Sequence, residues 1–180
     1  MPTDALDPLA VWIARTLLAT LFAQAALAKF ADTALFEQQL AAYRVPQRLH
    51  ALAVRALPAL EGAAAVLLLS PWRVAGAALA GALLVAYGGA MAWHRLHGRE
   101  LDCGCGGEPL AVSWPLVARN ALLAAVALPA AAPAAARALE LADFAVVAAA
   151  LLVGALLYAA FHQVLRHAAR PIRRTTRWMH

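Results

Sequence analysis

The sequence predicts an all-α integral membrane protein, built as a bundle of transmembrane helices. Of its 180 residues, 64% are hydrophobic and only 14% are charged, and the mean hydropathy is +0.69. One soluble core of this size cannot hide so much apolar surface, because a folded surface needs more polar cover. The apolar residues also gather into five runs, each close to the ~20 residues that a helix needs to cross a bilayer.

These five runs predict the transmembrane spans of a single multi-pass domain. They cover residues 9–30, 51–70, 74–93, 113–132 and 144–161. The runs are rich in alanine and leucine and lack the two-residue alternation of membrane β-strands. The preceding stretch MPTDALDP is acidic and lacks the basic start of a secretory signal, so we expect the first span to be retained.

The first two spans carry ionisable side chains, and the segment between them is amphipathic. Arg15 interrupts the first span and Lys29 closes it, while the second span contains Arg55 and Glu61. We expect segment 31–49 to lie along the membrane interface, because its polar and apolar side chains alternate with a helical period.

The third and fifth spans lack charged residues, whereas the fourth contains Arg119 and Asn120. In the third span, Ala77, Gly81 and Gly88 are spaced by four and seven residues and therefore share one helix face. Small residues on such a face predict the close approach of a neighbouring helix.

The basic residues predict contact with lipid rather than with nucleic acid. The formal net charge is +5, but the arginines flank apolar runs and crowd into the tail, residues 162–180. Such a tail is expected to lie on anionic headgroups.

Ionisable residues at membrane depth mark either a site or a buried pair. The order of the spans places Lys29, Arg55 and Arg119 toward the side of the loop 94–112, with Glu61 near mid-membrane. We expect Glu61 to pair with Arg119. Two interpretations stay open: a structural tie between helices, or a cationic cluster that lowers the pKa of a nearby cysteine.

The only two cysteines, Cys103 and Cys105, lie in that loop with one glycine between them. A disulfide between them closes a small, strained ring, and strained disulfides are oxidising and labile. The pattern predicts a redox pair that exchanges with another dithiol or passes electrons to a membrane carrier, with a quinone as a candidate acceptor. The alternative is two reduced thiols in a glycine-rich turn.

A metal site is a second alternative for the same loop. His94 and His97 join Cys103 and Cys105 to supply four ligands of a type that zinc or copper accepts. The C-x-C spacing is tighter than that of the usual zinc knuckle. A non-catalytic membrane scaffold or metal-handling protein therefore stays open beside the redox function.

The distribution of lysine and arginine predicts which way the loop faces. With the N-terminus outside, ten basic residues flank the cytoplasmic ends of the spans, against two outside. The ten are Lys29, Arg44, Arg48, Arg95, Arg99, Arg166, Arg170, Arg173, Arg174 and Arg177, and the two are Arg73 and Arg137. This count places Cys103 and Cys105 at the cytoplasmic face.

Several short motifs resemble those of a known family. Residues 22–30 (FAQAALAKF), preceded by Arg15, resemble the first-helix signature of DoxX-like membrane proteins, and residues 57–61 (LPALE) resemble their second helix. Within that group, residues 102–107 (DCGCGG), followed by VSW at 112–114 and by Arg119-Asn120, resemble the methylamine-utilisation protein MauE family.

The resemblance implies a DoxX-like bundle of four transmembrane helices plus a fifth, C-terminal one, in the bacterial inner membrane. It implies a role in maturing the disulfide-rich small subunit of methylamine dehydrogenase, alongside a thioredoxin-like partner such as MauD. Cys103 and Cys105 would carry out the chemistry, and Lys29, Arg55, Glu61, Arg119 and Asn120 would support it. That client is periplasmic, so the resemblance and the charge count place the dithiol on opposite sides.

Overall fold

The computed structural model describes residues 5–98 and 112–168, which form six helices. They are α1 (Pro8–Ala31), α2 (Thr33–Ala42), α3 (Gln47–Leu69), α4 (Arg73–Leu96), α5 (Trp114–Ala131) and α6 (Leu141–Ala168). All except α2 are long and apolar enough to cross a membrane by length and composition. The prediction of an all-helical, multi-span membrane protein is confirmed.

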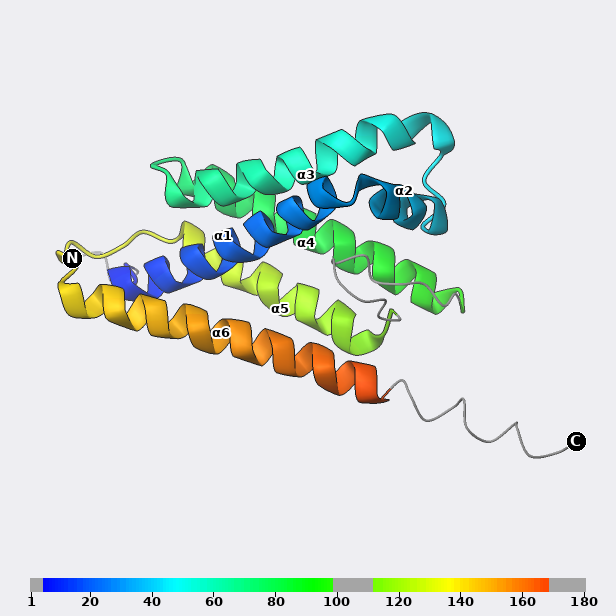
Figure 1. The fold of residues 1–180 in the computed structure, drawn as a ribbon. Helices are drawn as coiled ribbons and strands as arrows, with labels where there is room; N and C mark the ends of the chain where they lie inside the picture. The colour runs from blue at the N-terminus through cyan, green and yellow to red at the C-terminus, as the bar shows by residue number, and fades with distance from the viewer. Residues whose placement is uncertain (1–4, 99–111, 169–180) are drawn as a thin grey trace, which may run out of the picture.

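Successive long helices run in opposite directions along the bundle (Figure 1). Helix α1 packs chiefly on α3, and α4 packs on both α3 and α5. One end of the bundle holds the start of α1 and the connections α3–α4 and α5–α6. The other end, called here the loop end, holds α2, the end of α4 and the start of α5. The segment 99–111 therefore connects two helices at the loop end, between Gly98 and Val112.

The small-residue face predicted in the third span is confirmed as the contact between α4 and α5. A Cβ placed on Gly81 would lie 3.6 Å from the Cβ of Ala127, and one on Gly88 would lie 3.2 Å from the Cβ of Asn120. Ala77, on the same face, is buried. The two backbones approach closely because these positions carry almost no side chain.

Helix α6 lies at the side of the four-helix core, as predicted for the fifth span. It packs mainly on α1, where a Cβ on Gly154 would come within 2.8 Å of Leu17. The helix continues to Ala168, so it extends past residue 161, the predicted end of the fifth span, into the basic segment 162–180. Phe161 and Leu165 pack against a buried cluster at the loop end, which extends the helix; residues 169–180 lie outside the described part.

Two arginines bind the carboxyl ends of neighbouring helices at the end of the bundle opposite the loop end. The Nε of Arg15 donates to the Leu68 carbonyl at 2.6 Å, and its Nη2 to the Ser70 carbonyl at 3.3 Å. The Nη1 of Arg73 donates to three carbonyls at the end of α5, the shortest being Ala132 at 2.7 Å. Carbonyls at a helix end lack intrahelical partners, and these side chains satisfy them.

Candidate functional site

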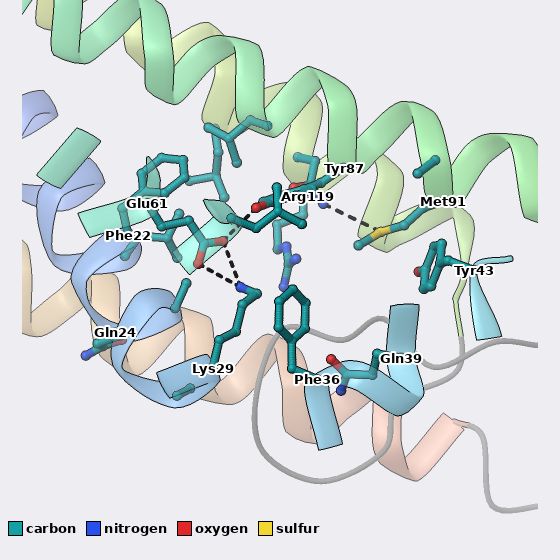
Figure 2. Close-up of a pocket in the computed structure, with 18 of the residues that line it drawn as sticks. Phe22, Gln24, Lys29, Phe36, Gln39, Tyr43, Glu61, Tyr87, Met91 and Arg119 are labelled. Carbon is teal, nitrogen blue, oxygen red and sulfur yellow. Dashed lines mark hydrogen bonds and ion pairs between the residues drawn. The ribbon is translucent and has the colours of Figure 1, made fainter. Parts of the chain in front are cut away.

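The loop half of the bundle contains a cavity of about 490 Å³. Every helix contributes to its wall, and Figure 2 shows the labelled side chains around it. Most of the wall is apolar, but several polar side chains also line it. These are Gln24, Lys29, Gln39, Tyr43, Glu61, Tyr87, His94, Arg119, Asn120, Tyr158 and His162. An apolar pocket with a few placed polar groups is the usual form of a small-molecule site.

A buried ion pair joins α1 to α3 in this cavity. The Nζ of Lys29 lies 2.7 Å from Oε1 and 2.9 Å from Oε2 of Glu61, whose carboxylate is almost completely buried. The hydroxyl of Tyr87 on α4 donates to Oε1 at 2.8 Å. The expected pair of Glu61 with Arg119 is wrong, because Lys29 provides the ion pair to this carboxylate.

The buried face of α1 explains why Lys29, and not Arg119, pairs with Glu61. Leu18, Phe22, Ala26 and Lys29 are buried and follow one another at steps of four, four and three residues, so they form one stripe on α1. Since α1 packs chiefly on α3, this stripe carries Lys29 to Glu61.

Arg119 points instead toward α6. Its Nη1 lies 3.2 Å from Nε2 of His162 and 3.4 Å from the Tyr158 hydroxyl, and its guanidinium lies 5.5 Å from the centre of the Tyr158 ring. The Nδ1 of His162 lies 2.9 Å from the Tyr158 carbonyl. A proton on Nδ1 satisfies that contact and leaves Nε2 to accept from Arg119.

Asn120 and Arg55 have different surroundings. Asn120 is buried, and its Nδ2 donates to the Leu116 carbonyl at 2.9 Å and to the sulfur of Met91 at 3.7 Å. It lines the cavity where α4 meets α5.

Arg55 is exposed on α3 and is not part of the cavity wall. A supporting role of Arg55 in the site would therefore require a partner from outside the described residues.

The two histidines of the metal hypothesis face different environments. His94 is buried and lines the cavity. His97 is exposed, its Nδ1 lies 2.7 Å from the Trp93 carbonyl, and its ring stacks on Trp93 with centroids 4.4 Å apart. Within residues 5–98 and 112–168, no group of three or more His, Cys, Asp or Glu side chains could hold a metal ion. Cys103 and Cys105 lie outside these residues.

Three tyrosines and one histidine of the cavity were not predicted from the sequence: Tyr43, Tyr87, Tyr158 and His162. A detectable signal was present, since Tyr158 and His162 are four residues apart and therefore share a helix face. Tyr87 gives a second signal, because its hydroxyl group lies within a span that contains no charged residue. Polar aromatic side chains in apolar spans usually turn their polar atom toward a partner.

Comparison with known proteins places the chain in a family. Residues 7–133 match the family model described as "Methylamine utilisation protein MauE". A protein of that name from Paracoccus denitrificans is 39% identical over 128 residues, covering 68% of this chain and 69% of the relative. A second, from Paracoccus versutus, is 39% identical over 131 residues, covering 70% of each.

The matched range contains α1 to α5, and therefore the Lys29–Glu61 pair, Tyr87 and Arg119, whereas α6 lies beyond it. No solved structure matches this chain. The family model and both relatives carry the name of the family that the motifs of the sequence resemble, and the chain belongs to the MauE family.

Proposed function

We propose that this protein is an accessory protein of methylamine utilisation in the bacterial inner membrane. The observation that carries the proposal is membership of the MauE family, in a chain whose only two cysteines are one glycine apart. The dithiol of Cys103 and Cys105 supports disulfide formation or isomerisation in a maturing client. The client proposed is the small subunit of methylamine dehydrogenase or a similar protein.

The chemistry is thiol–disulfide exchange. A thiolate of the client attacks the Cys103–Cys105 disulfide and forms a mixed disulfide, and a second client thiolate then releases the reduced pair. The client gains one disulfide, and this chain gains two thiol protons and two electrons. Where a thioredoxin-like partner of the MauD kind acts as carrier, its dithiol takes the client's place in these two steps, and its new disulfide is then passed to the client by a second exchange.

The position of the segment in the chain supports this role. It joins α4 to α5 at the loop end of the bundle, next to helices that carry the cavity's polar side chains (Figure 1). Its anchor on the α5 side is firm, because Val112 is buried in a cluster with Met91 and Leu116.

The test is maturation of the client in cells whose own copy of this gene has been removed. Cys103→Ser and Cys105→Ser should each abolish growth on methylamine and leave the client with incomplete disulfides, measured by mass spectrometry. Ser113→Ala, just beyond the segment, is the matched control and should support growth. Membrane levels of all variants should equal those of the wild-type protein.

The non-catalytic alternative gives the opposite result. A scaffold needs neither thiol, so full maturation with either single serine variant would overturn the redox function. Zinc or copper that copurifies with the wild-type protein and is lost in both variants would favour the metal-handling function instead.

A further inference from the structure

His94 differs from the histidine that follows α4 and from the two histidines of α6 in the contacts of its Nδ1 atom. In the others, Nδ1 lies 2.7–2.9 Å from the carbonyl oxygen four residues earlier; they are His97, His162 and His167. The Nδ1 of His94 is buried and has no hydrogen-bond partner among the described residues. The residue is only 6% exposed, and its ring meets Tyr43 edge to face at 5.0 Å.

A buried nitrogen without a partner is costly, so it calls for an explanation. His94 lines the cavity, and a ligand there would supply the missing hydrogen bond.

Lys29 offers a second hydrogen-bond donor to the same space. Its ammonium has three N–H groups, and Glu61 accepts from it with two oxygens. The Nζ lies 5.5 Å from the centre of the Phe36 ring and 5.7 Å from that of Tyr87, and Figure 2 shows it between α1 and these rings. Because Glu61 already balances the charge of Lys29, this part of the cavity favours an uncharged acceptor.

The rest of the wall favours a flat apolar ring. Phe22, Phe36, Tyr43, Tyr87 and Tyr158 present aromatic surfaces around a space of about 490 Å³, which lies within the range of small-molecule sites. Aromatic side chains pack well on a planar ligand. An acyl chain would fill such a space but would offer no acceptor to His94 or Lys29.

We propose that the cavity binds a membrane quinone, with His94 and Lys29 donating hydrogen bonds to its ring oxygens. A quinone is neutral, planar and soluble in lipid, and its two carbonyl groups accept hydrogen bonds at opposite edges of the ring. The redox consequence rests on the proposed function. Oxidation of Cys103 and Cys105 to a disulfide releases two electrons and two protons, and the same numbers reduce one quinone to its quinol.

The test is binding of ubiquinone-1 to the purified full-length protein, measured by isothermal titration calorimetry in detergent. The wild-type protein should bind about one equivalent. His94→Phe keeps a flat ring but removes both nitrogens, and should weaken binding about tenfold or more, the loss of one good hydrogen bond. His97→Phe, an exposed position three residues further on, is the matched control and should leave affinity unchanged.

Two further variants separate the possible causes of failure. Ala28→Phe puts a ring into the cavity and should abolish binding whatever the state of His94. The double variant Cys103→Ser/Cys105→Ser should bind ubiquinone-1 with wild-type affinity, because the hydrogen bonds proposed for the quinone come from His94 and Lys29 and from neither cysteine. The binding measurement therefore tests the quinone site separately from the redox function. Three results would each overturn the quinone site. The first is a lack of saturable binding of ubiquinone-1 to the wild-type protein, and the second is equal affinity of His94→Phe and the wild-type protein for it. The third is a phospholipid in the cavity that ubiquinone-1 cannot displace.

Discussion

The ammonium of Lys29, two residues before the end of α1, turns inward to the carboxylate of Glu61 in the middle of α3. A lysine near the end of a membrane helix commonly extends toward water. Here both carboxylate oxygens accept from it at 2.7 and 2.9 Å, and Tyr87 donates a third hydrogen bond to the same group. Three helices, α1, α3 and α4, therefore meet at one buried carboxylate.

Removal of one partner of this pair should be far more costly than removal of both. Lys29→Met leaves a buried carboxylate without its counter-charge and should lower the free energy of unfolding by ~3–5 kcal/mol. Lys29→Met/Glu61→Met removes both charges and should recover most of that loss. The melting temperature in detergent measures both effects.

Arg55→Gln, at an exposed position of α3, is the control for the loss of one cationic side chain. If the melting temperature of Lys29→Met were no lower than that of Arg55→Gln, the Lys29–Glu61 ion pair would not contribute to stability.

The depth of the polar residues was predictable from the sequence, but their partners were not. Counting along alternating spans placed Lys29 and Arg119 on the same side of the bundle, and both line the cavity there. The choice between them depends on how each helix is rotated about its axis. Arg119 lies on the side of α5 that faces α6, where it contacts Tyr158 and His162. Nothing in the sequence indicated this contact, because the span 144–161 contains no charged residue that could pair with an arginine.

Other features followed more directly from local sequence. The spans were predictable because a bilayer imposes a helix length, and the α4–α5 contact was predictable because Gly81 and Gly88 share a face. The length of α6 was less evident, because the apolar run ends at Phe161, whereas the helix continues to Ala168 and Leu165 packs against the cluster at the loop end.

Arg15 should stabilise the corner between α3 and α4. Arg15→Met removes the hydrogen bonds to the carbonyls of Leu68 and Ser70 and should cost ~1.5–3 kcal/mol, because the donor is charged and the Leu68 contact is buried. Arg15→Lys should not restore the loss, because an ammonium lacks the planar fork that reaches two carbonyls. Arg48→Met, at an exposed site, should leave the melting temperature unchanged; full rescue by lysine would contradict this role.

The contact between α4 and α5 should tolerate a side chain at Gly89 but not at Gly88. Gly88→Leu places its Cβ 3.2 Å from the Cβ of Asn120, and the added carbons should cost ~1–3 kcal/mol by overpacking. At Gly89 no heavy atom lies within 4 Å of a new Cβ, and leucine there also raises helix propensity by ~1 kcal/mol. Equal melting temperatures of the two leucine variants would mean that the helices are not in contact at Gly88.

The proposed client requires the dithiol to face the periplasm. A membrane-impermeant maleimide added to intact spheroplasts should therefore label Cys103 and Cys105 after reduction. The charge count favours the other side, but it includes Lys29, whose charge is turned inward and balanced by Glu61. Labelling only after the membrane is opened would place the thiols in the cytoplasm and remove a periplasmic client from the proposal.

The redox function of Cys103 and Cys105 is tested by the redox state of the two thiols in living cells. Acid quenching followed by maleimide labelling gives an unambiguous mass shift, because the chain has no other cysteine. We predict two populations, one that takes up two maleimides at once and one that takes them up only after reduction, with the oxidised population falling when cells are depleted of quinone. A pair that is fully labelled without prior reduction under every condition, with the client maturing normally, would contradict the redox function.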